Sequence, residues 1–142
     1  MFKDYKSKLD LPSTLELLEY SVFPDPDRFG ATLQGYKERD DWKLYGLEED
    51  GELIGIAGFQ AQADGAIELM HLAVKPEHRR KGYGRGVLLE LLEQEKPSRV
   101  IAETDEEAVD FYRSVGFTVY SLGEKFPGVE RFRCIYEAEE EE

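Results

Sequence analysis

The segment His78–Gly86 reads HRRKGYGRG, in which three glycines stand among four basic residues. An apolar run at 66–74 (AIELMHLAV) precedes it, and 85–96 (RGVLLELLEQEK) follows it with apolar residues at helical spacing. The glycines therefore connect a predicted buried strand to a predicted helix. The first N–H groups of a helix have no partner within it, and glycine lets a ligand approach the backbone closely. The pattern predicts a site for an anion with several oxygens, such as a pyrophosphate.

The spacing of these glycines excludes two common phosphate-binding patterns. No Gly-Lys-Ser/Thr follows, so the segment is not a Walker loop. The dinucleotide fingerprint GxGxxG is also absent, because Gly82, Gly84 and Gly86 are spaced too compactly. From the bare pattern, a basic surface turn that binds nothing stays open as an alternative.

Charge is distributed unevenly along the chain. The net charge of the 142 residues is −13, yet Lys75–Arg85 holds five basic residues and one acidic residue. The other residues therefore carry −17 in total. This acidic remainder argues against nucleic acid as a partner, because phosphate contacts need Lys and Arg. It favours a cationic partner, and amines are the obvious class.

Composition predicts a single cytoplasmic domain. The length suits one domain, no apolar run could span a membrane, and the start MFKDYKSKLD lacks the apolar stretch of a signal peptide. A single cysteine, Cys134, excludes an internal disulfide and metal-site spacing, so we expect no metal and no membrane partner. We expect the folded domain to cover 1–136 and a solvated acidic tail to cover 137–142.

The order of expected strands and helices predicts an α/β (α+β) fold. Strands are expected at 1–9, on both sides of Asp50-Gly51 within 42–60, and at 66–74, 98–103, 117–122 and 128–139. Helices are expected at 11–23, 27–40, 85–96 and 104–117, with a loop at 23–30. In the last helix, Thr104 and Glu107 have capping-box spacing, and Gly116 is the expected stop. This order predicts a mixed sheet covered by helices.

Two blocks of the sequence resemble the GCN5-related N-acetyltransferases, the GNAT family. The segment 72–93 matches that family's acetyl-CoA motif, Val-x-Pro followed by Arg/Gln-x-x-Gly-x-Gly/Ala, at Val74–Pro76 and Arg79–Gly84. The segment 103–117 (ETDEEAVDFYRSVGF) is similar to the family's second conserved block, which ends in Tyr-x-x-x-Gly-Phe. The resemblance covers Glu68–Phe117. It implies a single-domain, mostly antiparallel twisted sheet of about six or seven strands with about four helices.

The resemblance implies that acetyl-CoA is the co-substrate. Backbone groups of Leu72 and Val74 would bind the acetyl and pantetheine amides as an added strand would, and N–H groups of Arg80–Arg85 would hold the pyrophosphate. Asp105 stands where many relatives have an asparagine near the pantetheine arm, but a carboxylate cannot donate an amide N–H, so we expect it to cap a helix. The residues expected at the cofactor are Leu72, Ala73, Val74, Arg79, Arg80, Lys81, Gly82, Tyr83, Gly84, Arg85 and Asp105.

Tyr112 and Glu68 are the expected catalytic residues. The resemblance places Tyr112 where the family commonly has a tyrosine beside the CoA sulfur, as the acid for the leaving thiolate, and core packing is the alternative. Glu68 matches a catalytic glutamate of the histone-acetylating branch, and a solvent-facing strand residue is the alternative. His71, which titrates near neutrality, or a water relay could be the base instead. Alternation puts Glu68 and Met70 on one face of the strand and His71 on the other, unless a bulge intervenes.

The sequence therefore predicts an N-acetyltransferase that moves an acetyl group from acetyl-CoA to a primary amine of a small molecule or protein. The amine attacks directly in a ternary complex. A non-enzymatic acyl-CoA binding or sensing module is the alternative. The resemblance implies that the acceptor-binding loops lie in the first half, which matches only in element order, so the acceptor is not identified. The segment 22–29 (VFPDPDRF) could line an amine pocket or be a plain surface loop. The terminal strands could pair two copies into a homodimer.

Overall fold

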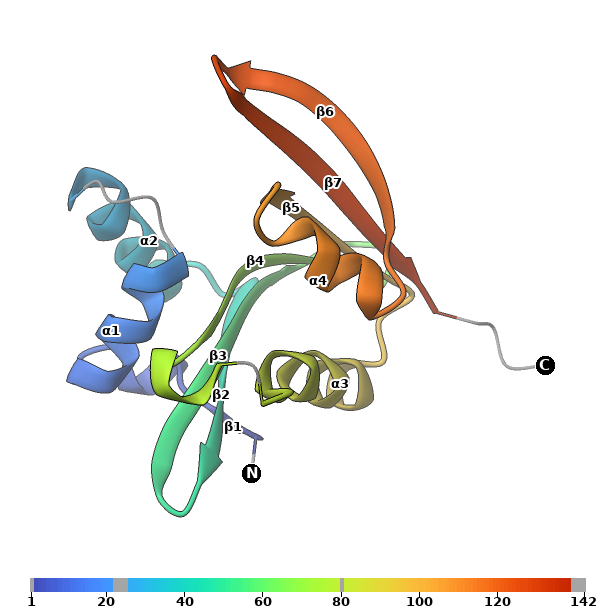
Figure 1. Cartoon of the computed structure of the whole chain (residues 1–142). Coiled ribbons are helices and arrows are strands. Elements are labelled where there is room, and N and C mark those ends of the chain that lie inside the picture. The colour runs from blue at the N-terminus through green and yellow to red at the C-terminus, as the bar shows by residue number, and fades with distance from the viewer. Residues whose placement is uncertain (1, 22–25, 80, 139–142) are drawn as a thin grey trace. The chain divides into compact units, whose positions relative to one another are not determined.

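A computed structural model describes residues 2–21, 26–79 and 81–138, which form seven strands and four α-helices (Figure 1). The strands are β1 (Phe2–Asp4), β2 (Trp42–Glu49), β3 (Glu52–Ala61), β4 (Ile67–Val74), β5 (Arg99–Asp105), β6 (Thr118–Phe126) and β7 (Val129–Glu137). The helices are α1 (Pro12–Ser21), α2 (Pro26–Glu38), α3 (Tyr83–Glu95) and α4 (Val109–Ser114), with 3₁₀ turns η1 (Lys6–Lys8) and η2 (Pro76–His78). Across the described ranges, no helix combines the length and the apolar character needed to cross a bilayer.

The strands are hydrogen-bonded in the order β1-β2-β3-β4-β5-β7-β6. β4 and β5 run parallel, whereas the pairs β1–β2, β2–β3, β5–β7 and β6–β7 are antiparallel. The expected mixed, mostly antiparallel sheet is thereby confirmed. The chain divides into two compact units. The first comprises Met1–Ala61 and Met70–Lys96, the second comprises Gln62–Leu69 and Pro97–Glu142, and β4 contributes residues to both.

The first unit has a core built from both helical and strand residues. Its buried members are Tyr5, Leu9, Leu17, Leu18, Tyr36, Leu44, Leu53, Ile56 and Ala73. The predicted apolar side of α3 is buried as well, through Val87, Leu88 and Leu91. This helix lies close to β3 because Gly55 has no side chain: a Cβ there would come within 3.2 Å of Val87 Cγ2. The buried side of α3 therefore packs closely on β3.

In the second unit, α4 lies against β6 and β7. Ala102 of β5 lies opposite Cys134 of β7, and both residues are fully buried. Cys134 is thus a packing residue of β7, and burial raises the pKa of its thiol. Gly116, with φ of +98°, follows the end of α4 as predicted.

The expected capping box at Thr104 and Glu107 is wrong. Thr104 and Asp105 extend β5, where they pair with Phe132 and Arg131 of β7, so the ladder continues past the predicted helix start. The Asp105 carboxylate instead accepts hydrogen bonds from the N–H groups of Glu107 (3.0 Å) and Ala108 (3.1 Å). Asp105 therefore accepts hydrogen bonds from the N–H groups of the turn that leads into α4, as its expected capping role implies.

Two other expected boundaries are also wrong. The first strand covers only Phe2–Asp4, and η1 replaces its predicted second half. The predicted loop at 23–30 is shorter, because α2 begins at Pro26, where a proline fits the first turn of a helix. The rest of that predicted loop, 23–25, lies outside the described residues, as do Val22, Arg80 and the tail positions 139–142.

Candidate active site

The glycine segment forms an open helix start. Gly82 has φ of +84° and is the N-cap of α3, with no side chain capping the helix and no acidic residue in its first turn. The first helical bond of this turn runs from the Gly86 N–H to the Gly82 carbonyl at 2.9 Å. A Cβ built on Gly82 or Gly86 would meet nothing within 4 Å. The free N–H groups at this helix end can therefore be approached by an anion.

Basic side chains surround this helix start. Lys81, Arg85 and Arg79 are exposed. Arg79 is nevertheless held in place, because its Nε donates to the Val74 carbonyl at 3.0 Å and its guanidinium lies 5.1 Å from the centre of the Tyr20 ring. Tyr20 belongs to α1, so this helix helps to orient a cation beside the turn. Sequence reasoning missed Tyr20, which stands 59 positions away from Arg79 and gives no local signal.

Acidic side chains of the β2–β3 hairpin contact residues of the turn and of the segment before it. The Tyr83 hydroxyl donates to Glu49 at 2.6 Å, and Glu52 lies 3.4 Å from the Lys75 ammonium and 3.6 Å from the His78 ring nitrogen. The Tyr83 side chain thus points to the hairpin, so only its backbone is free for a cofactor. Ligand atoms of Glu52, Glu77 and His78 lie within 4.8 Å of one another, and Glu52 of that cluster already pairs with the Lys75 ammonium.

Strand β4 carries the residues expected along the acyl arm. Of the described residues of β4, only Ile67–Leu69 pair with β5. Ala73 is buried and Leu72 and Val74 are half-buried. Met70 and Ala73, three positions apart, both pack on the core of the first unit. Simple alternation along β4 is therefore wrong, and His71 does not lie opposite Met70 in the way we expected.

His71 is bonded to a tyrosine of α2. Its Nδ1 lies 2.6 Å from the hydroxyl of Tyr36, whose side chain is 0% exposed. Burial lowers the pKa of His71 to about 4 and raises the pKa of Tyr36. Both groups are therefore neutral near pH 7. The apolar spacing of Phe29, Leu33 and Tyr36 predicts that Tyr36 is buried, but no sequence pattern pairs it with His71.

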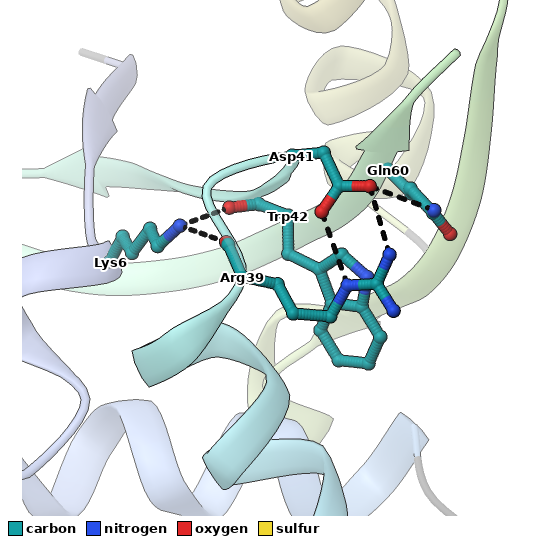
Figure 2. A network of polar contacts seen from close by, with 5 residues as sticks. All are labelled: Lys6, Arg39, Asp41, Trp42 and Gln60. Carbon is teal, nitrogen blue, oxygen red and sulfur yellow. Dashed lines mark hydrogen bonds and ion pairs between the residues drawn. The ribbon is translucent and has the colours of Figure 1, made fainter.

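A network at the end of α2 fixes the surroundings of Tyr36 (Figure 2). Lys6 donates to the carbonyl oxygens of Arg39 and Trp42, both at 2.6 Å. The Asp41 carboxylate accepts from Arg39 at 3.2 and 3.1 Å and from Gln60 at 3.0 Å, as Figure 2 shows. The Arg39 guanidinium lies 5.6 Å from the centre of the Trp42 ring. These bonds tie the helix end to the first strands and hold the Trp42 indole in one place.

The two expected catalytic residues both belong to the second unit. Glu68 is exposed and lies opposite Ile101 in the β4–β5 ladder. Tyr112 is buried, at 8% exposed, and its ring meets those of Phe111 and Phe117 edge-on at 5.3 and 5.2 Å. Burial, followed by Cys134 and Asp105, raises the pKa of Tyr112, so its hydroxyl is protonated. Tyr112 is buried, whereas Phe111 is half-buried.

Comparison with known proteins identifies a family. Residues 40–119, more than half of the chain, match the model of an acetyltransferase (GNAT) domain. An uncharacterised N-acetyltransferase of Bacillus methanolicus is 27% identical over 64 residues, which is 45% of this chain and only 53% of that protein. A GNAT-family protein of Desulfovibrio desulfuricans has a TM-score of 0.77 at 20% identity over 96% of this chain and 98% of its own. A GNAT acetyltransferase of Elizabethkingia anophelis with acetyl-CoA bound has a TM-score of 0.73 at 14% identity over 97% of both chains.

Proposed function

The chain belongs to the GCN5-related N-acetyltransferase (GNAT) family, and from that premise we propose that it transfers the acetyl group of acetyl-CoA to a primary amine. The amine attacks the thioester directly in a ternary complex. The open start of α3 carries this proposal. A helix end with free N–H groups, no acidic residue in its first turn and adjacent cations suits the pyrophosphate of coenzyme A.

In this proposal the backbone holds most of the acetyl-CoA. The N–H groups of 82–85 bind the pyrophosphate, and Arg79, Lys81 and Arg85 add charge-assisted hydrogen bonds. Leu72–Val74 receives the acetyl and pantetheine amides as it would receive another strand. The short ladder between β4 and β5 supports this role, because it ends at Leu69. Asp105 is not assigned to the cofactor, since its carboxylate serves the turn before α4.

The reaction forms a C–N bond and breaks a C–S bond. The lone pair of the amine attacks the thioester carbonyl carbon, and N–H groups of the backbone stabilise the oxyanion. When the C–S bond breaks, its electron pair leaves on sulfur, which takes a proton from the Tyr112 hydroxyl; solvent later restores that proton. The proton of the attacking amine passes to Glu68, either directly or through a water. The raised pKa of Tyr112 supports its part, because the hydroxyl is kept protonated.

The acceptor in this proposal is a cationic amine of a small molecule or a protein. A net charge of −13 attracts cations and repels the phosphates of nucleic acids. A lysine-like amine has a pKa of about 10.4, so it arrives protonated and must lose a proton before it can attack. This requirement is why the proposal needs a base or a water relay. Pairing of two copies through terminal strands stays a prediction.

Binding and turnover measurements test this proposal together. Calorimetry with acetyl-CoA comes first, followed by release of free thiol with a panel of a polyamine, an aminoglycoside, a lysine peptide and a peptide with a free N-terminus. Binding with thiol release for at least one amine is expected. Binding without thiol release from any amine would support the acyl-CoA sensing module instead. Absence of binding would contradict both functions.

Substitution of Tyr112 tests the chemical step. Tyr112→Phe keeps the packing but removes the hydroxyl, so kcat should fall by roughly 100-fold, the usual loss for a general acid. The Kd for acetyl-CoA should stay the same. Tyr120→Phe is the matched control, because the Tyr120 side chain on β6 is exposed, and it should leave kcat unchanged. Near-normal turnover of Tyr112→Phe would assign Tyr112 to the core alone.

A further inference from the structure

Tyr36 and His71 form a hydrogen-bonded pair in the first unit. The Tyr36 hydroxyl and His71 Nδ1 are 2.6 Å apart, and the two ring centres are 5.5 Å apart with a tilt of 55°. Tyr36 is 0% exposed, whereas His71 is half-buried. Tyr36 therefore lies in the core, whereas His71, which carries the Nε2 atom, is partly accessible to solvent.

Gly58 confines the Tyr36 hydroxyl, and Trp42 confines the Tyr36 ring. Gly58 of β3 faces it, and a Cβ at this position would overlap the hydroxyl. The Trp42 ring meets the Tyr36 ring edge-on at 5.2 Å and 72°, and the indole also fills the space above Gly35. Trp42 is held in turn by the network of Figure 2. The hydroxyl cannot turn away from His71 without disturbing this packing.

Either the Tyr36 hydroxyl or the Nδ1 of His71 donates the hydrogen bond between them, and the choice sets the tautomer of His71. If Nδ1 carried the hydrogen, it would donate to the phenol oxygen, and the Tyr36 hydroxyl would need another acceptor. Among the residues that the structure describes, its one hydrogen-bond partner is His71. A fully buried hydroxyl without an acceptor is costly. If the hydroxyl donates to Nδ1 instead, both atoms are satisfied, and the imidazole hydrogen is on Nε2.

We propose that Tyr36 is a positioning residue that fixes His71 as its Nε2–H tautomer, so that His71 serves acetyl transfer as a neutral hydrogen-bond donor and not as the base. In this tautomer Nδ1 is occupied by the phenol and Nε2 has no lone pair to accept the proton of an amine. The proton must then go to Glu68 or to a water relay. The role of His71 in acetyl transfer rests on the proposed function, whereas its tautomer does not.

NMR of the imidazole nitrogens tests the tautomer without any enzyme assay. The chain has only two histidines, so a comparison with His78→Gln assigns the signals of His71 in ¹⁵N-labelled protein. We expect a protonated Nε2 and an unprotonated, hydrogen-bonded Nδ1. In Tyr36→Phe, which keeps the ring, the Nδ1 signal should shift and the tautomers should begin to exchange. A protonated Nδ1 in the wild type, or unchanged signals in Tyr36→Phe, would overturn the proposal.

Two substitutions of His71 test its part in the reaction. The amide of His71→Gln offers an N–H near the position of Nε2 but cannot act as a base, and His71→Leu offers neither. We expect kcat to be roughly fivefold higher in His71→Gln than in His71→Leu, the worth of one hydrogen bond. The rise of the rate with pH on the acidic side of the pH–rate profile, which reports ionisation of the base, should remain in His71→Gln. Loss of that rise in His71→Gln would make His71 the base and contradict the proposal. If no preparation releases thiol, the proposed function fails, and the NMR result still decides the tautomer.

Discussion

The glycine turn before α3 and the Tyr36–His71 pair belong to the same unit, yet they are specified in opposite ways. The turn works through its backbone: its helix end is open, and Gly82 and Gly86 face empty space. The pair works through two side chains, and its glycine, Gly58, faces a space that the Tyr36 hydroxyl already fills. The turn therefore depends on glycines without side chains in open space, and the pair depends on tight side-chain packing. Substitutions and a change of pH should therefore affect the two regions differently.

The packed region should show the largest effect on stability. Gly58→Ala places a methyl group on the Tyr36 hydroxyl, which Trp42 and His71 prevent from moving, so the free energy of unfolding should fall by about 3 kcal/mol. Urea denaturation measures this loss. Gly30→Ala in α2 is the control, because its Cβ meets nothing within 4 Å, and it should raise stability by about 0.5–1 kcal/mol. Equal stability of the two variants would mean that the pair is not tightly packed.

The buried histidine should make stability fall in acid. The pKa of His71 is about 4 in the folded chain, against about 6.5 in the unfolded chain. Above pH 6.5 both states are neutral at this residue, and as the pH falls from there toward 4, only the unfolded state takes up the proton. The wild type should therefore lose about 2 kcal/mol between pH 8 and pH 5 through His71. His71→Gln should lack this part of the loss in urea denaturation at the two pH values, and an identical loss would contradict burial of a neutral imidazole.

The open turn should lose ligand affinity and little stability. Gly82→Ala forces a side chain into the left-handed region beside the anion site, so the Kd for CoA should rise about tenfold, or 1.4 kcal/mol. Gly123→Ala on β6 is the matched control, since Gly123 has φ of +78° and open space around it. Both variants should lose about 1 kcal/mol of stability, but Gly123→Ala should bind CoA normally in calorimetry. Equal Kd values for CoA in Gly82→Ala and Gly123→Ala would mean that the turn does not bind the cofactor.

The smallest expected effect concerns the side chain that orients Arg79. Tyr20→Leu removes the ring under the guanidinium, so the Kd for CoA should rise about threefold, in line with an exposed cation–π contact. Tyr20→Phe keeps the ring and loses only the bond to Glu16, so it should bind CoA as the wild type does. A parallel loss in both variants would assign the effect to the hydroxyl and not to the ring.

The same difference explains how much of the molecule the sequence could predict. The turn is a local feature, and strand, glycines and helix follow one another within 66–96, so both the elements and the expected anion site can be derived from that stretch. Tyr36 and His71 are 35 positions apart, and their bond depends on how α2 and β4 pack. Apolar periodicity predicts that Tyr36 is inside but cannot name its partner.

Boundaries failed where tertiary pairing overrode local preference. Thr104 fits a helix cap by spacing, but pairing with Phe132 keeps it in β5 and leaves the turn to Asp105. The prolines near 24–26 indicate a loop, yet Pro26 also suits the first turn of α2. Alternation along β4 failed at Met70 and Ala73, which share one core. At Thr104, a residue satisfied two local patterns and a distant contact chose between them.

Acetylation of Lys6 would report how often its hydrogen bonds to two main-chain carbonyls break. An acetyltransferase is exposed to its own reagent, and surface lysines can be modified by it slowly. The Lys6 nitrogen, however, donates to two main-chain carbonyls, which hold it beside Arg39 and Trp42 (Figure 2). Acetyl groups that accumulate on Lys6 during storage with acetyl-CoA would therefore report how often this nitrogen leaves the two carbonyls, and peptide mass spectrometry can measure that rate.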